Sequence, residues 1–129
     1  MPVKKVKDIM SRDIVFVSSN ADIKEIIRTM IEKNIHSVVV REGLYFKGFV
    51  TDDDVFDALR TLILDGFLPK RTADSLISSP TIKIDQENTV EEAILTMARN
   101  NVKYLLVEKE GNVVGLVSVT DLLKMYIEE

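Results

Sequence analysis

The sequence contains no cysteine and no tryptophan, and its only histidine is His36. Without cysteine, the chain has no disulfide framework, no thiol nucleophile and no thiolate ligand for a metal. His36 has no His or Cys partner nearby with which to share a metal site, and as a general base it lacks an obvious nucleophile. We therefore expect no required cofactor, no metal site and no enzymatic activity.

Long apolar runs are also missing. The longest extend over a few residues, as at Val38-Val39-Val40, whereas a membrane-spanning helix needs about 20. The N-terminus has lysines and an aspartate where a signal peptide would have an apolar stretch. We therefore expect a cytoplasmic protein with no membrane segment.

An excess of positive charge is absent as well. The 129 residues include 17 Lys and Arg against 21 Asp and Glu, for a net charge of −4. Domains that bind duplex nucleic acid usually show a basic face, because neutralised phosphates supply most of their affinity. Nucleic acid is therefore a disfavoured partner, while the 46% of apolar residues is enough for a folded core.

What the sequence does contain is an internal repeat. The run Gly48-Phe49-Val50-Thr51 recurs as Gly115-Leu116-Val117-Ser118, which is 67 positions later (115 − 48). The same offset, without a gap, aligns identical residues elsewhere: Ser11 with Ser78, Glu25 with Glu92, Met30 with Met97, Asn34 with Asn101, and Asp54 with Asp121. One copy is too short to bury its apolar residues well. We therefore predict a first repeat with a connector helix at 1–66 and a second repeat at 67–129, which together form one globular module.

Both copies predict the same order of elements. A short amphipathic turn precedes a brief strand, a helix with apolar residues three and four apart, a two-stranded hairpin and a last helix. Asn34 and Asn101 stand where a left-handed helix cap is expected. The predicted bounds are Val6–Met10 and Ala73–Ile77 for the turns; Ile14–Val17, Val38–Arg41 and Tyr45–Val50 for the first three strands; Thr81–Ile84, Leu105–Glu108 and Val113–Val117 for their counterparts; and helix starts at Ile23, Asp52, Val90 and Val119, with the Asp52 helix ending at Asp65–Gly66.

The residues most informative about function close each copy, as Gly-h-h-Thr-x-x-Asp at 48–54 and Gly-h-h-Ser-x-x-Asp at 115–121, where h is apolar. The hydroxyl residue is a suitable helix N-cap, and the aspartate three residues later completes a capping box. A helix N-terminus also offers unpaired N–H groups to an anion, an aspartate there can accept hydrogen bonds from a ribose diol, and the glycine allows a close backbone approach. The structural and ligand-binding interpretations are compatible.

These ordered motifs resemble the tandem CBS-domain pair, or Bateman module, of stand-alone CBS-domain proteins. The resemblance covers nearly the whole chain, from Asp8–Val17 and Ser75–Ile77 to the two glycine-led motifs. It implies an α/β (α+β) fold of two β-α-β-β-α repeats packed with pseudo-twofold symmetry, two clefts between the repeats, and a homodimer. The chain departs from the family at Val39 and Leu106, where members often carry proline.

The resemblance also implies an adenosine-type effector: AMP, ADP, ATP or S-adenosylmethionine. By motif position, Asp54 and Asp121 hold the ribose, and Thr51 and Ser118 contact phosphate or ribose. The other implied contacts border the base, at Ile14, Val15, Thr81 and Ile82, or face the cleft, at His36, Ser37, Lys103 and Tyr104.

Individual residues keep alternative interpretations. His36 fits a half-exposed strand edge as well as a phosphate contact, Lys103 fits a solvated strand end, and Tyr104 either covers the core or stacks on a base. The acidic run Asp52-Asp53-Asp54 resembles a metal-binding sequence, but on a first helical turn it suits the helix dipole. The second copy has Val119-Thr120 there, so we predict that it binds anionic ligands more tightly.

The doubled motif and the lack of a catalytic constellation favour a ligand-binding regulatory module. The alternative is a protein-interaction or dimerisation scaffold whose ligand sites are vestigial and whose apolar helix faces form the contact. A protein effector is a further candidate partner. Nucleic-acid binding, which is known within the resembling family, is disfavoured by the acidic charge.

Overall fold

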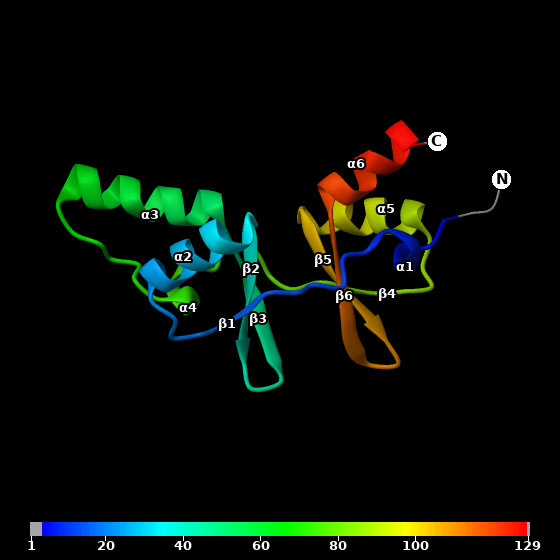
Figure 1. Cartoon of the computed structure of the whole chain (residues 1–129), viewed down its shortest axis with the longest axis horizontal. Coiled ribbons are helices and arrows are strands. Elements are labelled where there is room, and N and C mark those ends of the chain that lie inside the picture. The colour runs from blue at the N-terminus through cyan, green and yellow to red at the C-terminus, as the bar shows by residue number, and fades with distance from the viewer. Residues whose placement is uncertain (1–3, 129) are drawn as a thin grey trace. The chain divides into compact units, whose positions relative to one another are not determined.

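The computed structural model describes residues 4–128, with side chains for 4–127 (Figure 1). Within these residues, each half contains one three-stranded sheet and three helices. The elements of the first half are α1 (Val6–Ile9), β1 (Phe16–Ser18), α2 (Ile23–Lys33), β2 (Ser37–Glu42), β3 (Tyr45–Thr51) and α3 (Asp52–Asp65). Those of the second half are α4 (Ala73–Leu76), β4 (Lys83–Asp85), α5 (Val90–Asn100), β5 (Tyr104–Lys109), β6 (Asn112–Ser118) and α6 (Val119–Glu128). None of these helices has the length and apolar character needed to cross a bilayer.

The two sheets have the same topology. Their strand orders are β1-β2-β3 and β4-β5-β6, and in each the first pair is parallel and the second antiparallel. The register is the same as well, because Phe16 pairs with Val39 as Lys83 pairs with Leu106. Both hairpins shift register at equivalent places, after Val40 and after Val107. The predicted α+β fold of two repeats is confirmed.

The helices begin and end where local chemistry favours it. Asp22 caps α2 and Thr89 caps α5 through side-chain oxygens that accept N–H groups of the first turn. Both helices end at an asparagine in the left-handed conformation, with φ of 52° at Asn34 and 51° at Asn101. The predicted asparagine caps are confirmed, as is the end of α3 at Gly66, where φ is 80°.

Each sheet packs one face against its own helices to form a core. Ile26 of α2 lies in the same buried cluster as Val38 of β2. At the equivalent positions of the second half, Ala93 of α5 and Leu105 of β5 share a cluster. The second core therefore has a smaller helix residue and a larger strand residue than the first, so that much of the buried volume is conserved.

The chain divides into two compact units that do not follow the repeat boundary. One is Val15–Pro80, and the other combines the described parts of Met1–Ile14 and Thr81–Glu129. The segment ahead of each repeat's first strand packs on the other repeat: Val6 is fully buried and its N–H donates to the Asn88 carbonyl, at 2.8 Å. The compact units are therefore not the two sequence repeats, because each repeat supplies the other with its leading segment. The repeat bounds of 1–66 and 67–129 stay a prediction.

The segments ahead of β1 and β4, which each pack on the other repeat, are called the crossing segments here. Gly48 and Gly115 make room for them. A side chain at Gly48 would place its Cβ 2.5 Å from Ile77 and 2.7 Å from the Ser79 carbonyl oxygen. At Gly115 the Cβ would meet Met10 at 2.5 Å and the Ser11 carbonyl oxygen at 2.9 Å. The close approach that these glycines permit is therefore to the chain itself.

The first strand of each half begins two residues later than the alternating pattern predicts. Paired residues start at Phe16, not Ile14, and at Lys83, not Thr81. The residue just ahead still lies beside the central strand, because the carbonyl of Val15 accepts a hydrogen bond at 3.0 Å from the Val39 N–H. An alternating apolar pattern indicates which side chains are buried, but it does not indicate at which residue the hydrogen-bonded strand pairing begins.

Candidate functional site

The start of α3 is a complete capping box. The Thr51 N–H donates to Asp54 Oδ2 at 2.8 Å, and the Thr51 hydroxyl donates to the same oxygen at 3.1 Å. The Asp54 N–H donates in return to Thr51 Oγ1, at 3.3 Å. Both side chains are half-buried, so they are held in place without being sealed from solvent.

The start of α6 repeats this arrangement within a few tenths of an ångström. The Ser118 N–H and hydroxyl donate to Asp121 Oδ2 at 2.8 and 3.0 Å, and the Asp121 N–H donates to Ser118 Oγ at 3.2 Å. These residues are half-buried too. The capping interpretation is therefore confirmed in both copies, while a contact to phosphate or ribose stays a prediction.

The sheet of the first repeat brings further predicted residues to the same end. Ser37 pairs with Thr51 across the hairpin, and the Asp52 N–H donates to the His36 carbonyl at 2.9 Å. Val15 lies beside β2 through its carbonyl. Ile14 is the exception, because it belongs to the other compact unit.

The second repeat assembles its residues in the same way. Tyr104 pairs with Ser118, and the Val119 N–H donates to the Lys103 carbonyl at 3.1 Å. Thr81–Ile82 runs beside β5, since the carbonyl of its second residue accepts from the β5 backbone at 2.9 Å. Tyr104 is half-buried and Lys103 is exposed. One end of this sheet therefore groups five of the six residues predicted for the second copy, and the sixth, Asp121, lies on the first turn of α6 and bonds to Ser118.

The two sheet ends differ in charge. In the first repeat, His36 Nδ1 lies 3.1 Å from Asp52 Oδ2, and both side chains are mostly exposed, at 77% and 56%. In the second repeat, the equivalent residues are Lys103 and Val119, so a cation stands there without the carboxylate. Asp52 also accepts the Asp53 N–H, at 2.8 Å. Among the residues that the structure describes, no group of three or more His, Asp or Glu side chains could hold a metal ion.

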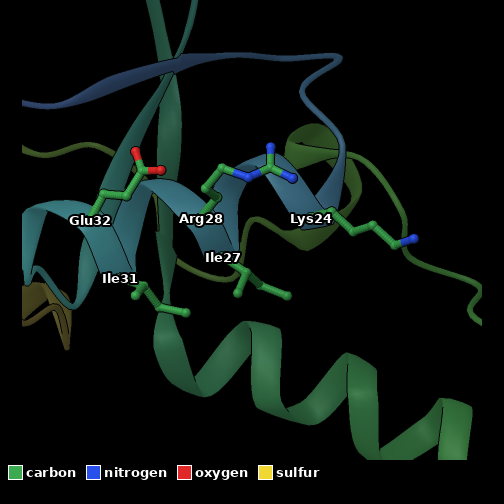
Figure 2. Close-up of a pocket in the computed structure, with 5 residues that line it drawn as sticks. All are labelled: Lys24, Ile27, Arg28, Ile31 and Glu32. Carbon is green, nitrogen blue, oxygen red and sulfur yellow. The ribbon is translucent and has the colours of Figure 1, made fainter.

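A groove between α2 and α3 is a feature that the sequence pattern did not predict. It consists of two adjoining hollows of about 400 and 380 Å³ that share Ile27 and Ile31. Figure 2 shows both isoleucines pointing from α2 toward α3, with Lys24, Arg28 and Glu32 along the same stretch of α2. The spacing of apolar residues three and four apart predicts that both isoleucines are buried, yet Ile31 is 74% exposed. The apolar stripe of α2 is wider than the face that the core buries, and this extra width was the sequence signal for an exposed groove.

Two α+β units of one topology, each with a hydroxyl–carboxylate box at the start of its last helix, define a tandem-repeat module with one candidate site per repeat. The CBS domain family model matches residues 6–61 and 73–128, and the chain belongs to this family.

Curated relatives span different lengths. The chain is 30% identical to CBS domain-containing protein MJ0729 of Methanocaldococcus jannaschii over 130 residues, which cover 98% of both chains. It is also 30% identical to CBS domain-containing protein YhcV of Bacillus subtilis, over 93% of this chain and 84% of that protein. Uncharacterized protein MJ1225 of Methanocaldococcus jannaschii is 30% identical as well, but the chain spans only 42% of its length.

Solved structures share the fold. The CBS domain pair of protein MJ0100, in complex with 5′-methylthioadenosine and S-adenosyl-L-methionine, has a TM-score of 0.80 at 22% identity, with 98% of both chains covered. An uncharacterized conserved protein from Pyrococcus horikoshii has a TM-score of 0.78 at 25% identity, over 98% of this chain and 95% of that one.

Proposed function

We propose that this chain is a regulatory module that senses an adenosine-type nucleotide: AMP, ADP, ATP or an S-adenosylmethionine-like compound. The observation that carries the proposal is the doubled, half-buried hydroxyl–carboxylate box, at Thr51 with Asp54 and at Ser118 with Asp121. Because each box lies at a helix N-terminus, it combines groups for a ribose with a field that favours an anion. The clefts expected between the repeats stay a prediction.

The geometry of each carboxylate supports this role. Both cap hydrogen bonds end on Oδ2 of the aspartate, in Asp54 and in Asp121 alike. The cap therefore orients the side chain and leaves Oδ1 for the hydroxyls of a ribose. A carboxylate that is oriented before binding loses little side-chain entropy when the ligand arrives.

Two further observations favour an adenosine compound and regulation. The related MJ0100 pair holds 5′-methylthioadenosine and S-adenosyl-L-methionine. The hydroxyl and carboxylate of each box are engaged with each other and with backbone N–H groups as a helix cap, an arrangement that suits holding a ligand in place. Ligand binding then acts by stabilising one conformation or one assembly over another.

The second repeat is the stronger site in this proposal. Lys103 stands beside the start of α6, whereas Asp52 stands beside the start of α3 and pairs with His36. A phosphate is attracted by the lysine and repelled by the carboxylate. AMP and ATP therefore bind more tightly to the site of Ser118 and Asp121.

The test is calorimetric titration of AMP, ADP, ATP and S-adenosylmethionine into the wild-type chain and into Asp54→Asn and Asp121→Asn. Asparagine still offers an oxygen to the cap but loses the carboxylate charge, and Asp65→Asn, at the exposed end of α3, is the matched control. We expect Asp121→Asn to remove the tighter binding event and Asp54→Asn the weaker one. Equal losses would contradict the ranking of the sites, and no binding of any of the four compounds to the wild type would contradict the proposal.

A dimerisation scaffold is the second candidate, and exposed apolar helix residues favour it. Phe56 and Ile63 of α3 are 69% and 81% exposed, and Leu123 and Tyr126 of α6 are 59% and 64% exposed. Apolar surface gathered on helices is typical of a contact between copies. Light scattering with and without ATP separates the two functions, because a scaffold forms a dimer whose affinity does not depend on the nucleotide.

A further inference from the structure

The hairpin of the first repeat, with Phe16 of the adjacent β1, carries an aromatic and cationic surface in which Phe16 and Phe46 are half-buried and the other residues are exposed. We call it the hairpin surface, and it consists of Phe16, Arg41, Leu44, Tyr45 and Phe46. The Phe16 and Phe46 rings stack with centroids 5.6 Å apart, and the Arg41 guanidinium lies 4.4 Å from the centroid of Phe16. Leu44 and Tyr45, at the turn, are 95% and 68% exposed.

The second repeat is an internal control for what the fold itself requires. Its hairpin has the same strand pairing and the same register shift, at Val107/Glu108 instead of Val40/Arg41. The five positions equivalent to the hairpin surface are Lys83, Glu108, Gly111, Asn112 and Val113. The hairpin therefore forms without aromatic residues at these positions, and the aromatic residues are specific to the first repeat.

The chemistry of the hairpin surface indicates what it binds. Arg41 is exposed and makes no ion pair within residues 4–127, so its N–H groups are available while its flat face is held on Phe16. A guanidinium positioned in this way is suited to bidentate binding of a carboxylate. Arginine and aromatic residues are also the types most often found at the energetic centre of protein interfaces.

We infer that the hairpin surface docks a protein partner through a segment that carries a carboxylate beside an apolar side chain. The carboxylate binds Arg41, and the apolar side chain packs on Leu44 and Tyr45. Tyr45 and Thr51 are the two ends of β3, so Leu44 and Tyr45 lie at the opposite end of this strand from the first capping box (Figure 1). The inference therefore does not rest on nucleotide binding, and a partner docked here leaves that site accessible.

The test uses amide NMR spectra of the isotope-labelled chain and three synthetic peptides in which leucine alternates with glutamate, lysine or serine. We expect the glutamate peptide to shift the resonances of Arg41, Leu44 and Tyr45, and the lysine and serine peptides to leave them unchanged. Residue-level detection matters because a short peptide binds weakly. No shift with the glutamate peptide, or equal shifts with all three, would overturn the inference.

Variants that replace the exposed side chains of the hairpin surface test the residues directly. Arg41→Glu and the double variant Leu44→Ser/Tyr45→Asn should each weaken binding of the glutamate peptide by about tenfold or more, as expected for residues at the centre of an interface. Lys109→Ser/Asn112→Ala, in the second hairpin, is the matched control and should bind as the wild type does. The same spectra show whether each variant is folded.

Two other outcomes would assign the surface differently and overturn the inference. Oligothymidylate that shifts the same resonances more strongly than the glutamate peptide would indicate base stacking on the rings. Self-association that Arg41→Glu abolishes would indicate a contact between copies of this chain. The Asp54→Asn variant should still bind the glutamate peptide, so failure of the nucleotide proposal leaves this result unchanged.

Discussion

The two repeats have one topology and distribute their chemistry differently. They share what the fold requires: the asparagine caps, the capping boxes and the glycines under the crossing segments. They differ in the residue at the centre of the first long helix, in the charge beside the last helix, and in the hairpin. The comparison shows that features common to both repeats serve the fold as well as any shared ligand, so they do not distinguish one repeat from the other. The differences are therefore where specific binding is to be sought.

The largest difference between the cores is Ile26 against Ala93. Ile26 is fully buried, and truncation to alanine leaves a cavity that the surrounding sheet fills only in part. We expect Ile26→Ala to lower the free energy of unfolding by about 2–5 kcal/mol, measured by urea denaturation.

The double variant Ile26→Ala/Val38→Leu sharpens this test, because it copies the pair found at Ala93 and Leu105. It should recover part of the loss, since the larger strand residue fills the space above the smaller helix residue. Val38→Leu alone should destabilise by overpacking. A double variant no more stable than Ile26→Ala would show that the two cores are not interchangeable solutions.

The motif glycines are equivalent in sequence but not in what surrounds them. The Cβ of Gly48→Ala would meet a branched isoleucine and a carbonyl oxygen at 2.7 Å, whereas that of Gly115→Ala would meet the flexible thioether of Met10 and a carbonyl at 2.9 Å. We expect Gly48→Ala to cost about 1–3 kcal/mol, the usual range for overpacking, and Gly115→Ala to cost less. Thermal melts of both variants check the order, and a larger loss for Gly115→Ala would contradict it.

The sequence predicted most of each repeat because the signals for its elements are local. Helix bounds followed from the spacing of apolar residues and from Asn34, Asn101 and Gly66. The pairing of Thr51 with Asp54 followed from the spacing of a capping box. Evidence of this kind lies within a few residues, so no knowledge of tertiary contacts was needed.

The crossing segments and the exposed hairpin could not be predicted in this way. The burial of Val6 in the core of the second repeat depends on a contact with residues more than 80 positions away, and no local pattern reports it. The exposure of Ile31 likewise depends on which helix covers which face. The glycines were assigned to ligand approach because the segment that occupies the space is distant in sequence.

The two candidate sites differ in charge, and this difference can be reduced by placing residues of the second repeat in the first. Asp52→Val/Asp53→Thr places the second repeat's residues in the first. Without its partner carboxylate, His36 becomes available to a phosphate, and a nearby repulsion is lost. We expect AMP affinity at the first site to rise by about fivefold, since a charge pair at 4 Å is worth about 1 kcal/mol in water.

Calorimetry with AMP, ATP and uncharged adenosine checks this exchange. The gain should be larger for ATP than for AMP, and adenosine should bind the variant as it binds the wild type. An equal gain for adenosine would mean that the substitutions act on shape and not on charge.

The smallest expected effect concerns how each crossing segment is held. In the second repeat, Lys7 and Lys5 hydrogen-bond to Glu87 and lower the pKa of its carboxyl from 4.5 to about 2. The first repeat has Asn20 at the equivalent position, so it lacks this pair of contacts. Because the pKa is depressed in the folded state, the stabilisation is complete above pH 4.5 and is lost as the pH falls through about 2.

Hydrogen exchange at the Lys7 and Val90 amides across this pH window measures how firmly the segment is held. Both amides donate hydrogen bonds between the segment and the second repeat. We expect Glu87→Gln to flatten the pH dependence of their protection, while Glu32→Gln, on the exposed surface of α2, should not. The contacts are solvent-exposed, so added salt should shrink the difference. Protection that falls equally with pH in Glu87→Gln and the wild type would mean that the carboxylate of Glu87 does not hold the segment, and that burial of Val6 and the backbone hydrogen bonds do.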